Sequence, residues 1–187
     1  MEDDQVIKKV ILEKAKCYSP NFFNWFGDWV NDPENSSKVV DENGEPLVVY
    51  HHTDNQSLSE FDPEFLNYFT KNGGTSNAFF FDENKTGTLD RLYDLPVFLN
   101  IRDLTTFVGT KEDLHSQGTT YRELVNASAL QYPSTGGLHM SKFDDNRMQN
   151  QEVWIAHHPN QIKSAGGNNG QFSSSNNIYE EFILEYN

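Results

Sequence analysis

A predicted β-hairpin over residues 39–50 constrains the fold of this chain more than any other stretch. Asn43 and Gly44 lie at its turn, and both tolerate the positive φ angles that a tight hairpin requires. The second predicted strand ends in an apolar run that is followed at once by three polar residues, His51, His52 and Thr53. Because a strand end fixes such side chains while the next loop leaves them open, we predict a functional site at this position.

The segment before the hairpin is dense in aromatic residues. Five of the eight residues 22–29 are phenylalanine or tryptophan. Ser19 followed by Pro20 is a typical start for a helix. We therefore predict a short helix whose aromatic side chains pack on the core, in preference to a platform for stacking a nucleotide.

The rest of the chain is predicted to contain more strands than helices. Apolar runs predict strands at residues 78–81, 95–101, around 136–140, 152–156 and 178–186, with Pro96 at a strand start or edge. Helices are expected from residue 3 or 4 to 17, within 82–93 and over 111–130, the last weakened near Gly118. Residues 54–77 and 166–177 are polar and are predicted to form loops. This order does not alternate as in a doubly wound sheet, so it predicts an α+β fold with two small sheets or one split sheet.

Length and charge narrow the class of protein further. The 187 residues suit one domain, which we place at residues 19–187 behind a helical appendage at 1–18. The net charge of −14 repels phosphate backbones and anionic lipid, so neither nucleic acid nor membrane is expected as a main partner. Cys17 is the single cysteine, which excludes an internal disulfide. The acidic N-terminus shows no signal peptide and no apolar run follows, so we expect a cytoplasmic protein, or one delivered into a target cell by a machine that needs no such signal.

Several short motifs, in this order, resemble one protein family. They are the segment 24–29, the hairpin segment 37–51, the strand Ala78-Phe79-Phe80-Phe81, the Gly-Leu-His-Met motif at 137–140, and the segment 153–165 with its Gln-Ile-Lys-Ser-Ala exit. Together they resemble the ADP-ribosyltransferase-like domains of phage and mobile-element polyvalent proteins, whose signature is histidine, aromatic, glutamate. The resemblance runs from about residue 19 to 178. It implies a split β-sandwich with a few peripheral helices, holding NAD in a cleft between two sheets.

The resemblance also assigns roles to residues near the two predicted strands. His51 would hydrogen-bond the adenosine ribose of NAD, and the backbone of His52, which stands where the family usually has glycine, would hold the nicotinamide amide. Phe80 stands where tyrosine is frequent and would stack on the cationic nicotinamide ring. Thr53 and Tyr93 complete the predicted NAD-binding residues.

The third member of the signature is a glutamate near the last strands. A carboxylate beside the ribose can stabilise the oxocarbenium-like state in which the nicotinamide bond breaks. Glu152 is favoured because it precedes the strand that leads to Gln161, and Glu181 is the alternative at the start of the last predicted strand. No metal site is predicted, because the adjacent pairs His51-His52 and His157-His158 offer at most one ligand each on a strand.

Two functions are consistent with this reading of the chain. The first is an NAD-dependent mono-ADP-ribosyltransferase, such as an effector or toxin, that modifies a protein or another macromolecule. The second is a catalytically inactive member of the same fold that serves as a binding module or a phage-associated structural protein.

Overall fold

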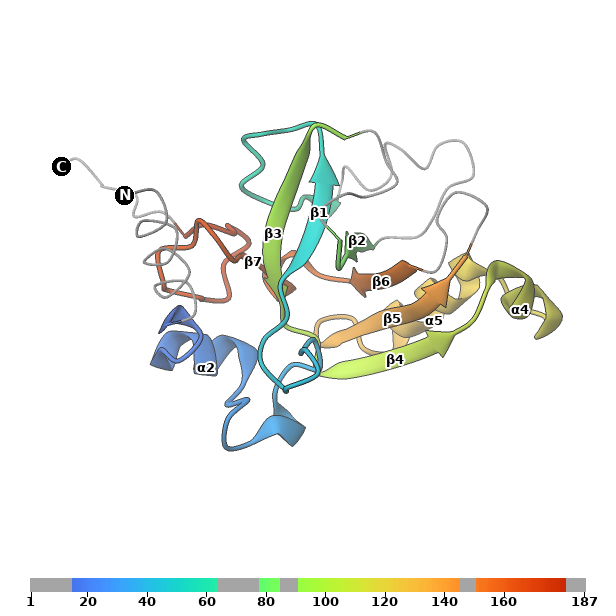
Figure 1. Ribbon diagram of the computed structural model, residues 1–187, viewed down its shortest axis with the longest axis horizontal. Coiled ribbons are helices and arrows are strands. Elements are labelled where there is room, and N and C mark those ends of the chain that lie inside the picture. Colours follow the sequence, from blue (N-terminus) through green and yellow to red (C-terminus); the bar gives the residue numbers. More distant parts are fainter. Residues whose placement is uncertain (1–14, 64–77, 85–90, 145–150, 181–187) are drawn as a thin grey trace.

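The computed structural model describes residues 15–63, 78–84, 91–144 and 151–180. Within these residues the fold is built on a seven-stranded sheet with the order β4-β5-β6-β2-β1-β3-β7 (Figure 1). The strands are β1 (Val49–Thr53), β2 (Phe79–Asp82), β3 (Tyr93–Leu99), β4 (Asp103–Val108), β5 (Gly136–Phe143), β6 (Gln151–Ala156) and β7 (Ile162–Ser164). All neighbouring strands are antiparallel except β4 and β5. A mixed sheet with a few helices confirms the predicted α+β class.

The sheet bends sharply where β1 meets β2. The ladder between these strands has the single register pair Tyr50–Asp82, whereas β1 pairs with β3 along its whole length, from Val49–Val97 to Thr53–Tyr93. In Figure 1, β1 and β3 consequently run steeply across the direction of β4, β5 and β6. The strands β4, β5, β6 and β2 form one half of the sheet and β1, β3 and β7 the other, and the two halves differ in direction.

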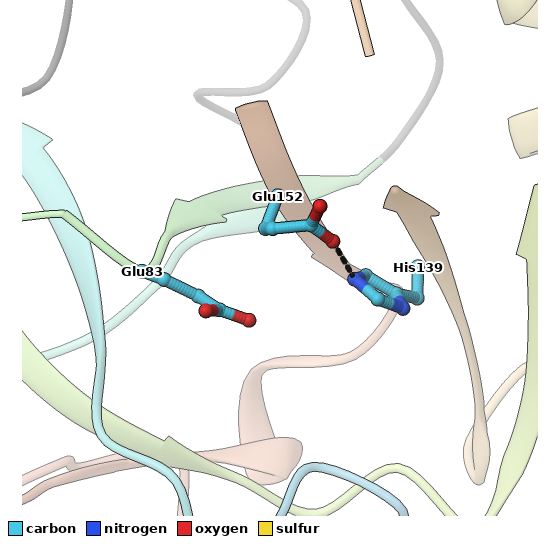
Figure 2. A group of neighbouring side chains, drawn as sticks. All are labelled: Glu83, His139 and Glu152. Atoms are coloured by element: carbon cyan, nitrogen blue, oxygen red, sulfur yellow. Dashed lines mark hydrogen bonds and ion pairs between the residues drawn. The ribbon is translucent and has the colours of Figure 1, made fainter. Parts of the chain in front are cut away.

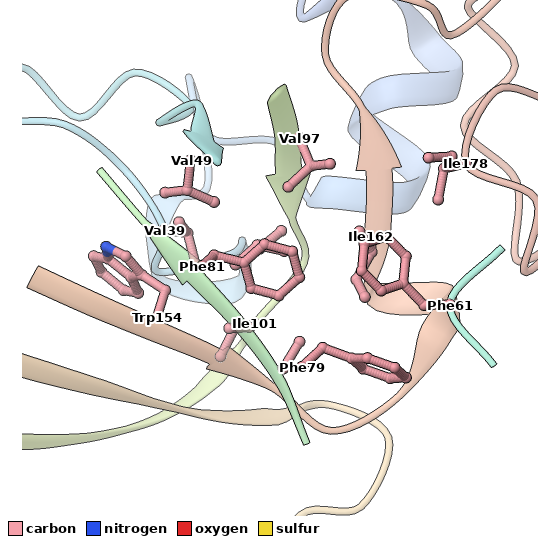
Figure 3. Close-up of a cluster of buried hydrophobic side chains, with 12 residues drawn as sticks. Val39, Val49, Phe61, Phe79, Phe81, Val97, Ile101, Trp154, Ile162 and Ile178 are labelled. Carbon is pink, nitrogen blue, oxygen red and sulfur yellow. The ribbon is translucent and has the colours of Figure 1, made fainter. Parts of the chain in front are cut away.

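The largest apolar cluster fills the angle between the two halves. It combines side chains from both, and Figure 3 shows them converging from β1, β2, β3, β6 and β7. The buried members are Val39, Val49, Phe61, Phe79, Phe81, Val97, Leu99, Ile101, Trp154, Ala156, Ile162 and Ile178. Phe61 lies in the predicted loop 54–77, so that segment is not confined to the surface but contributes to the core.

The aromatic segment forms helix α2 (Pro20–Phe26), as predicted. The Ser19 side chain accepts a hydrogen bond from the Phe22 amide and caps the helix, while Pro20 begins it. Phe22 and Phe26 are fully buried and stack on each other, with ring centroids 4.9 Å apart. The prediction that this segment packs on the core is therefore confirmed.

Two helices, α4 (Lys111–Ser116) and α5 (Tyr121–Gln131), replace the single helix expected over 111–130. Gly118 separates them with φ +74°, a conformation in which glycine meets no steric penalty. Each helix begins with its own capping box, Thr110 with Asp113 and Thr120 with Glu123. The N-cap residue Thr120 follows Gly118 by two positions, and this sequence pattern identifies the break between α4 and α5.

Two other predictions of secondary structure are wrong within the described residues, and one strand was not predicted. Tyr93 does not end a helix but opens strand β3, and residues 85–90 of that predicted helix lie outside the described residues. Strand β4 was not predicted, because its threonines interrupt the apolar pattern. Residues 178–180 form no strand, since Ile178 exchanges backbone hydrogen bonds with Ser59 and Ser164 outside any ladder, and residues 181–186 are not described.

The proposed appendage at residues 1–18 is described only from residue 15 onward. In this part Cys17 is buried among the aromatic side chains of α2, and the Lys16 ammonium donates to the Asn168 carbonyl at 2.7 Å. The described part of the segment thus packs on the domain. Among the described helices, none is long and apolar enough to cross a membrane.

Gln161 connects three strands through one buried amide. Its side-chain oxygen accepts from the backbone amides of His157 and His158 at 2.9 and 2.8 Å, just after β6. Its Nε2 donates to the carbonyl of Asn100 after β3 and to that of Gly136 at the start of β5, at 3.1 and 2.9 Å. Gln161, 1% exposed, thus pairs with four backbone groups.

Lys163 performs a similar function for the C-terminal loop. Its side chain is fully buried, and its ammonium donates to the carbonyls of Ser175 and Asn177 and pairs with the Glu180 carboxylate. Burial lowers the pKa of Lys163, and the Glu180 carboxylate opposes this shift. The Gln-Ile-Lys-Ser-Ala motif therefore supports the frame of the fold.

Replacing Gln161 tests how much the fold depends on this amide. Gln161→Leu keeps the volume but leaves buried backbone groups without partners, each costing about 1–3 kcal/mol. We expect the free energy of unfolding to fall by at least about 3 kcal/mol in urea denaturation. The same substitution at exposed Gln131 on α5 is the control and should change little. Equal losses in the two variants would contradict this role.

Candidate functional site

His51 lies at the bend of the sheet, where β1 and β2 separate. Its Nδ1 donates to the carbonyl of Phe80 at 3.0 Å, and its ring packs edge-on against Phe61 with centroids 4.9 Å apart. Burial lowers the pKa of His51, so the ring is neutral at pH 7. A neutral imidazole that donates from Nδ1 presents Nε2 as an acceptor, which suits a ligand hydroxyl.

The strand register places several predicted site residues on the same face of the sheet. Tyr50 pairs with Asp82, which sets His51 opposite Phe81, and Phe81 pairs with Trp154 on β6. Residues two positions apart on a strand share a face, so Thr53 lies on the His51 side of β1 and Glu152 on the Trp154 side of β6. Tyr93 pairs with Thr53 and joins this face. We call it the His51 face.

The carboxylate of Glu152 is held by three hydrogen bonds. Its Oε2 lies 2.8 Å from Nε2 of His139, and its Oε1 accepts from the Ser141 hydroxyl at 3.0 Å and from the Lys142 amide at 3.1 Å. Its side chain is 31% exposed, so solvent reaches it. The carboxylate is thus fixed in direction and still accessible.

A second carboxylate lies beside Glu152. The side chains of Glu83, His139 and Glu152 converge on one point of the His51 face (Figure 2). The Trp154 ring lies flat against His139, with centroids 3.8 Å apart and planes 6° apart, while its indole N–H donates to Glu83 at 3.0 Å. Sequence reasoning missed Glu83 and His139, because only the pairing of β2, β5 and β6 brings them to Glu152.

His52 and Phe80 lie on the opposite face. The His52 ring, 6% exposed, has Nδ1 2.7 Å from Asp94 and Nε2 3.0 Å from Asp82. Burial raises the pKa of Asp82, and His52 opposes this shift. The Phe80 ring stacks on Tyr121 of α5, 6.0 Å away. The Phe80 ring therefore lies on the other face of the sheet from the His51 ring. The His52 side chain, at the position where glycine was expected, also points away from the His51 face.

The remaining candidates divide between structural contacts and residues that are not described. The His157 ring lies 3.0 Å from the Ser128 hydroxyl, and the His158 ring accepts from the Asn160 amide and caps a short turn. Both act at the end of a strand, as predicted. Glu181 lies outside the described residues.

A cavity of about 330 Å³ lies elsewhere, beside α2. None of the predicted NAD-binding residues lines it. The lining residues are Asn24, Trp25, Asn100, Arg102, Ser134, Asn160, Phe172, Ser173 and Ser174.

Comparison with known families gives the assignment. The model of the family described as ADP-ribosyltransferase in polyvalent proteins matches residues 41–172, most of the chain. The chain belongs to this family. No curated protein and no solved structure matches it.

Membership of the ADP-ribosyltransferase family confirms the resemblance stated from sequence. The matched span includes His51, Phe80 and Glu152, and ends before Glu181. The aromatic helix α2 also lies outside it, whereas the seven strands and the helices α4 and α5 lie within it.

His157 gives the fold a predictable dependence on pH. Burial lowers the pKa of His157 from 6.5 to about 4. Between these values the unfolded chain binds a proton that the folded protein does not, so stability falls as pH drops from 6.5 toward 4. His157→Gln should flatten the decrease of Tm over this window, although His51 contributes in the same direction and leaves part of it.

Thermal melts at pH 7.5 and at about pH 5 would measure this effect. His115→Gln, on the exposed surface of α4, is the matched control and should melt with the dependence of the unmodified chain. A His157→Gln variant that keeps the full decrease would contradict the assignment.

Proposed function

We propose that this protein is an NAD-dependent mono-ADP-ribosyltransferase with a macromolecular acceptor, most simply a protein. The observation that carries the proposal is the position of Glu152, a fixed and accessible carboxylate on the same face of the sheet as His51. Family membership supplies the reaction class. We propose that NAD binds and reacts between His51 on one half of the sheet and Glu152 on the other.

The arrangement fits an extended ligand better than a small one. β1 and β6 are two strand spacings apart, roughly 10 Å, with β2 between them. A dinucleotide can span this distance, so its adenosine ribose would contact Nε2 of His51 and its nicotinamide ribose would approach Glu152. Thr53 and Tyr93 lie on the same face near His51, and Tyr93, 37% exposed, offers an accessible aromatic ring.

The proposed reaction needs a negative charge beside the ribose carbon that nicotinamide leaves. The bond between the ribose carbon and the nicotinamide nitrogen breaks, and its electron pair leaves with nicotinamide. The ribose then carries positive charge, which the Glu152 carboxylate stabilises. An acceptor nucleophile attacks the same carbon and loses its proton. His139, Ser141 and the Lys142 amide would hold the carboxylate in position, so little reorganisation is needed during the reaction.

One observation favours the second function, an inactive binding module. The Phe80 ring, expected to stack on the nicotinamide, packs instead against Tyr121 on the opposite face. An inactive member would bind NAD or a partner without turnover, and the experiments below distinguish the two.

NAD binding should depend on His51. In calorimetric titration of the full chain with NAD, His51→Ala should weaken binding by roughly tenfold or more, the value of one lost hydrogen bond of about 1.4 kcal/mol. Circular dichroism should show that the variant remains folded. His115→Ala is the control and should bind as the unmodified chain does. Unchanged affinity in His51→Ala would remove His51 from the site.

Transfer should depend on Glu152. With labelled NAD and a cell lysate, Glu152→Gln should lower transfer and NAD hydrolysis by ~10²–10³-fold and leave NAD binding largely intact, because the lost charge acts mainly in the transition state. Glu112→Gln, exposed on α4, is the matched control. If Glu181→Gln is inactive and Glu152→Gln is active, the catalytic carboxylate is Glu181 and not Glu152. Binding of NAD without turnover in the unmodified chain would favour the inactive module.

A further inference from the structure

Three side chains that bind transition metals converge on the His51 face. Ligand atoms of Glu83, His139 and Glu152 all lie within 4.8 Å of one another (Figure 2). They come from three neighbouring strands or their ends, β2, β5 and β6. The convergence therefore depends on the sheet and not on one flexible loop.

The orientation of these side chains is fixed by contacts around them. Trp154 stacks on the His139 ring and holds Glu83 through its indole N–H, so one residue positions two of the three groups. Ser141 and the Lys142 amide bind Oε1 of Glu152, which leaves its Oε2 facing Nε2 of His139. Metal sites in proteins use outer contacts of this kind to orient their ligands.

We propose that Glu83, His139 and Glu152 form a binding site for Zn²⁺. One imidazole nitrogen and two carboxylate oxygens suit Zn²⁺, whereas Mg²⁺ and Ca²⁺ prefer oxygen ligands alone. Zinc bonds of about 2.0–2.2 Å place neighbouring ligands roughly 3.0–3.5 Å apart. His139 and Glu152 are already this close, with 2.8 Å between Nε2 and Oε2, and the ligand atom of Glu83 lies within 4.8 Å of both. A water molecule completes four ligands.

The charges at the site are consistent with this proposal. The two carboxylates carry two negative charges, and the chain as a whole carries −14, which favours a cation. Nε2 of His139, the nitrogen that would bind zinc, lies 2.8 Å from Oε2 of Glu152.

Zinc at this site would also regulate the enzyme. An ion on Glu152 neutralises the charge that the ribosyl cation requires, so Zn²⁺ should inhibit transfer. This consequence rests on the proposed function, whereas zinc binding itself does not.

Calorimetry on the full, tag-free chain tests the site. Titration with ZnCl₂ should show one strong site, with no comparable heat from MgCl₂ or CaCl₂. Each of the variants Glu83→Gln, His139→Gln and Glu152→Gln removes one ligand. Zinc affinity should fall by more than the roughly 10–100-fold that loss of an outer contact costs.

Matched controls separate the site from other zinc-binding groups on the surface. His115→Gln and Glu112→Gln on exposed α4 should bind zinc as the unmodified chain does. Thermal melts without zinc check that each variant folds. If His139→Gln fails to fold, the two Glu→Gln variants still test the proposal. Absence of zinc binding, or affinity unchanged in both Glu→Gln variants, would overturn the proposal.

A turnover assay then tests inhibition separately. Each variant is compared with its own rate without zinc, and Glu83→Gln should need more zinc for half inhibition than the unmodified chain. If the chain binds zinc through these residues but never turns over NAD, the proposed transferase activity is wrong and the zinc site is established. If zinc occupies Glu152 and the turnover rate is unchanged, the proposed inhibition by zinc is wrong.

Discussion

The fold depends on a single buried amide. Gln161 accepts hydrogen bonds from the chain as it leaves β6 and donates to the chain after β3 and at the start of β5. These segments belong to the two halves of a sheet whose strand pairing across the bend consists of one register pair between β1 and β2. Because buried backbone groups must be paired, the amide fixes how the two halves close around their shared apolar cluster.

The closure determines which residues share a face. His51 and Thr53 on β1, Tyr93 on β3 and Glu152 on β6 come from three segments far apart in sequence, and the register aligns them on one side of the sheet. The same alternation turns His52 to the other side, where Asp82 and Asp94 enclose its ring. A histidine in place of glycine is thus accommodated without filling the His51 face.

The motifs that identify the family mostly serve the frame. Within the Gln-Ile-Lys-Ser-Ala segment, Gln161 binds backbone carbonyls and amides, and Lys163 binds backbone carbonyls. The groups suited to chemistry lie instead on β1, β5 and β6 and just after β2, among ordinary apolar residues. Glu152 draws its environment from His139, Ser141 and Trp154, a tryptophan that also belongs to the core. Packing and site geometry are therefore coupled at this point.

The sequence by itself determined the local features: the turn at Gly44, whose arms meet in one bridge between Val40 and Pro46, the strand that carries His51 and His52, the capped aromatic helix after Ser19, and the family. Each depends on residues adjacent along the chain, where φ preferences and side-chain period act directly. Only the tertiary structure decided that Tyr93 opens a strand and that Glu83 and His139 meet Glu152. These follow from strand register and long-range closure, and a shift of one residue in register would have turned every side chain to the other face.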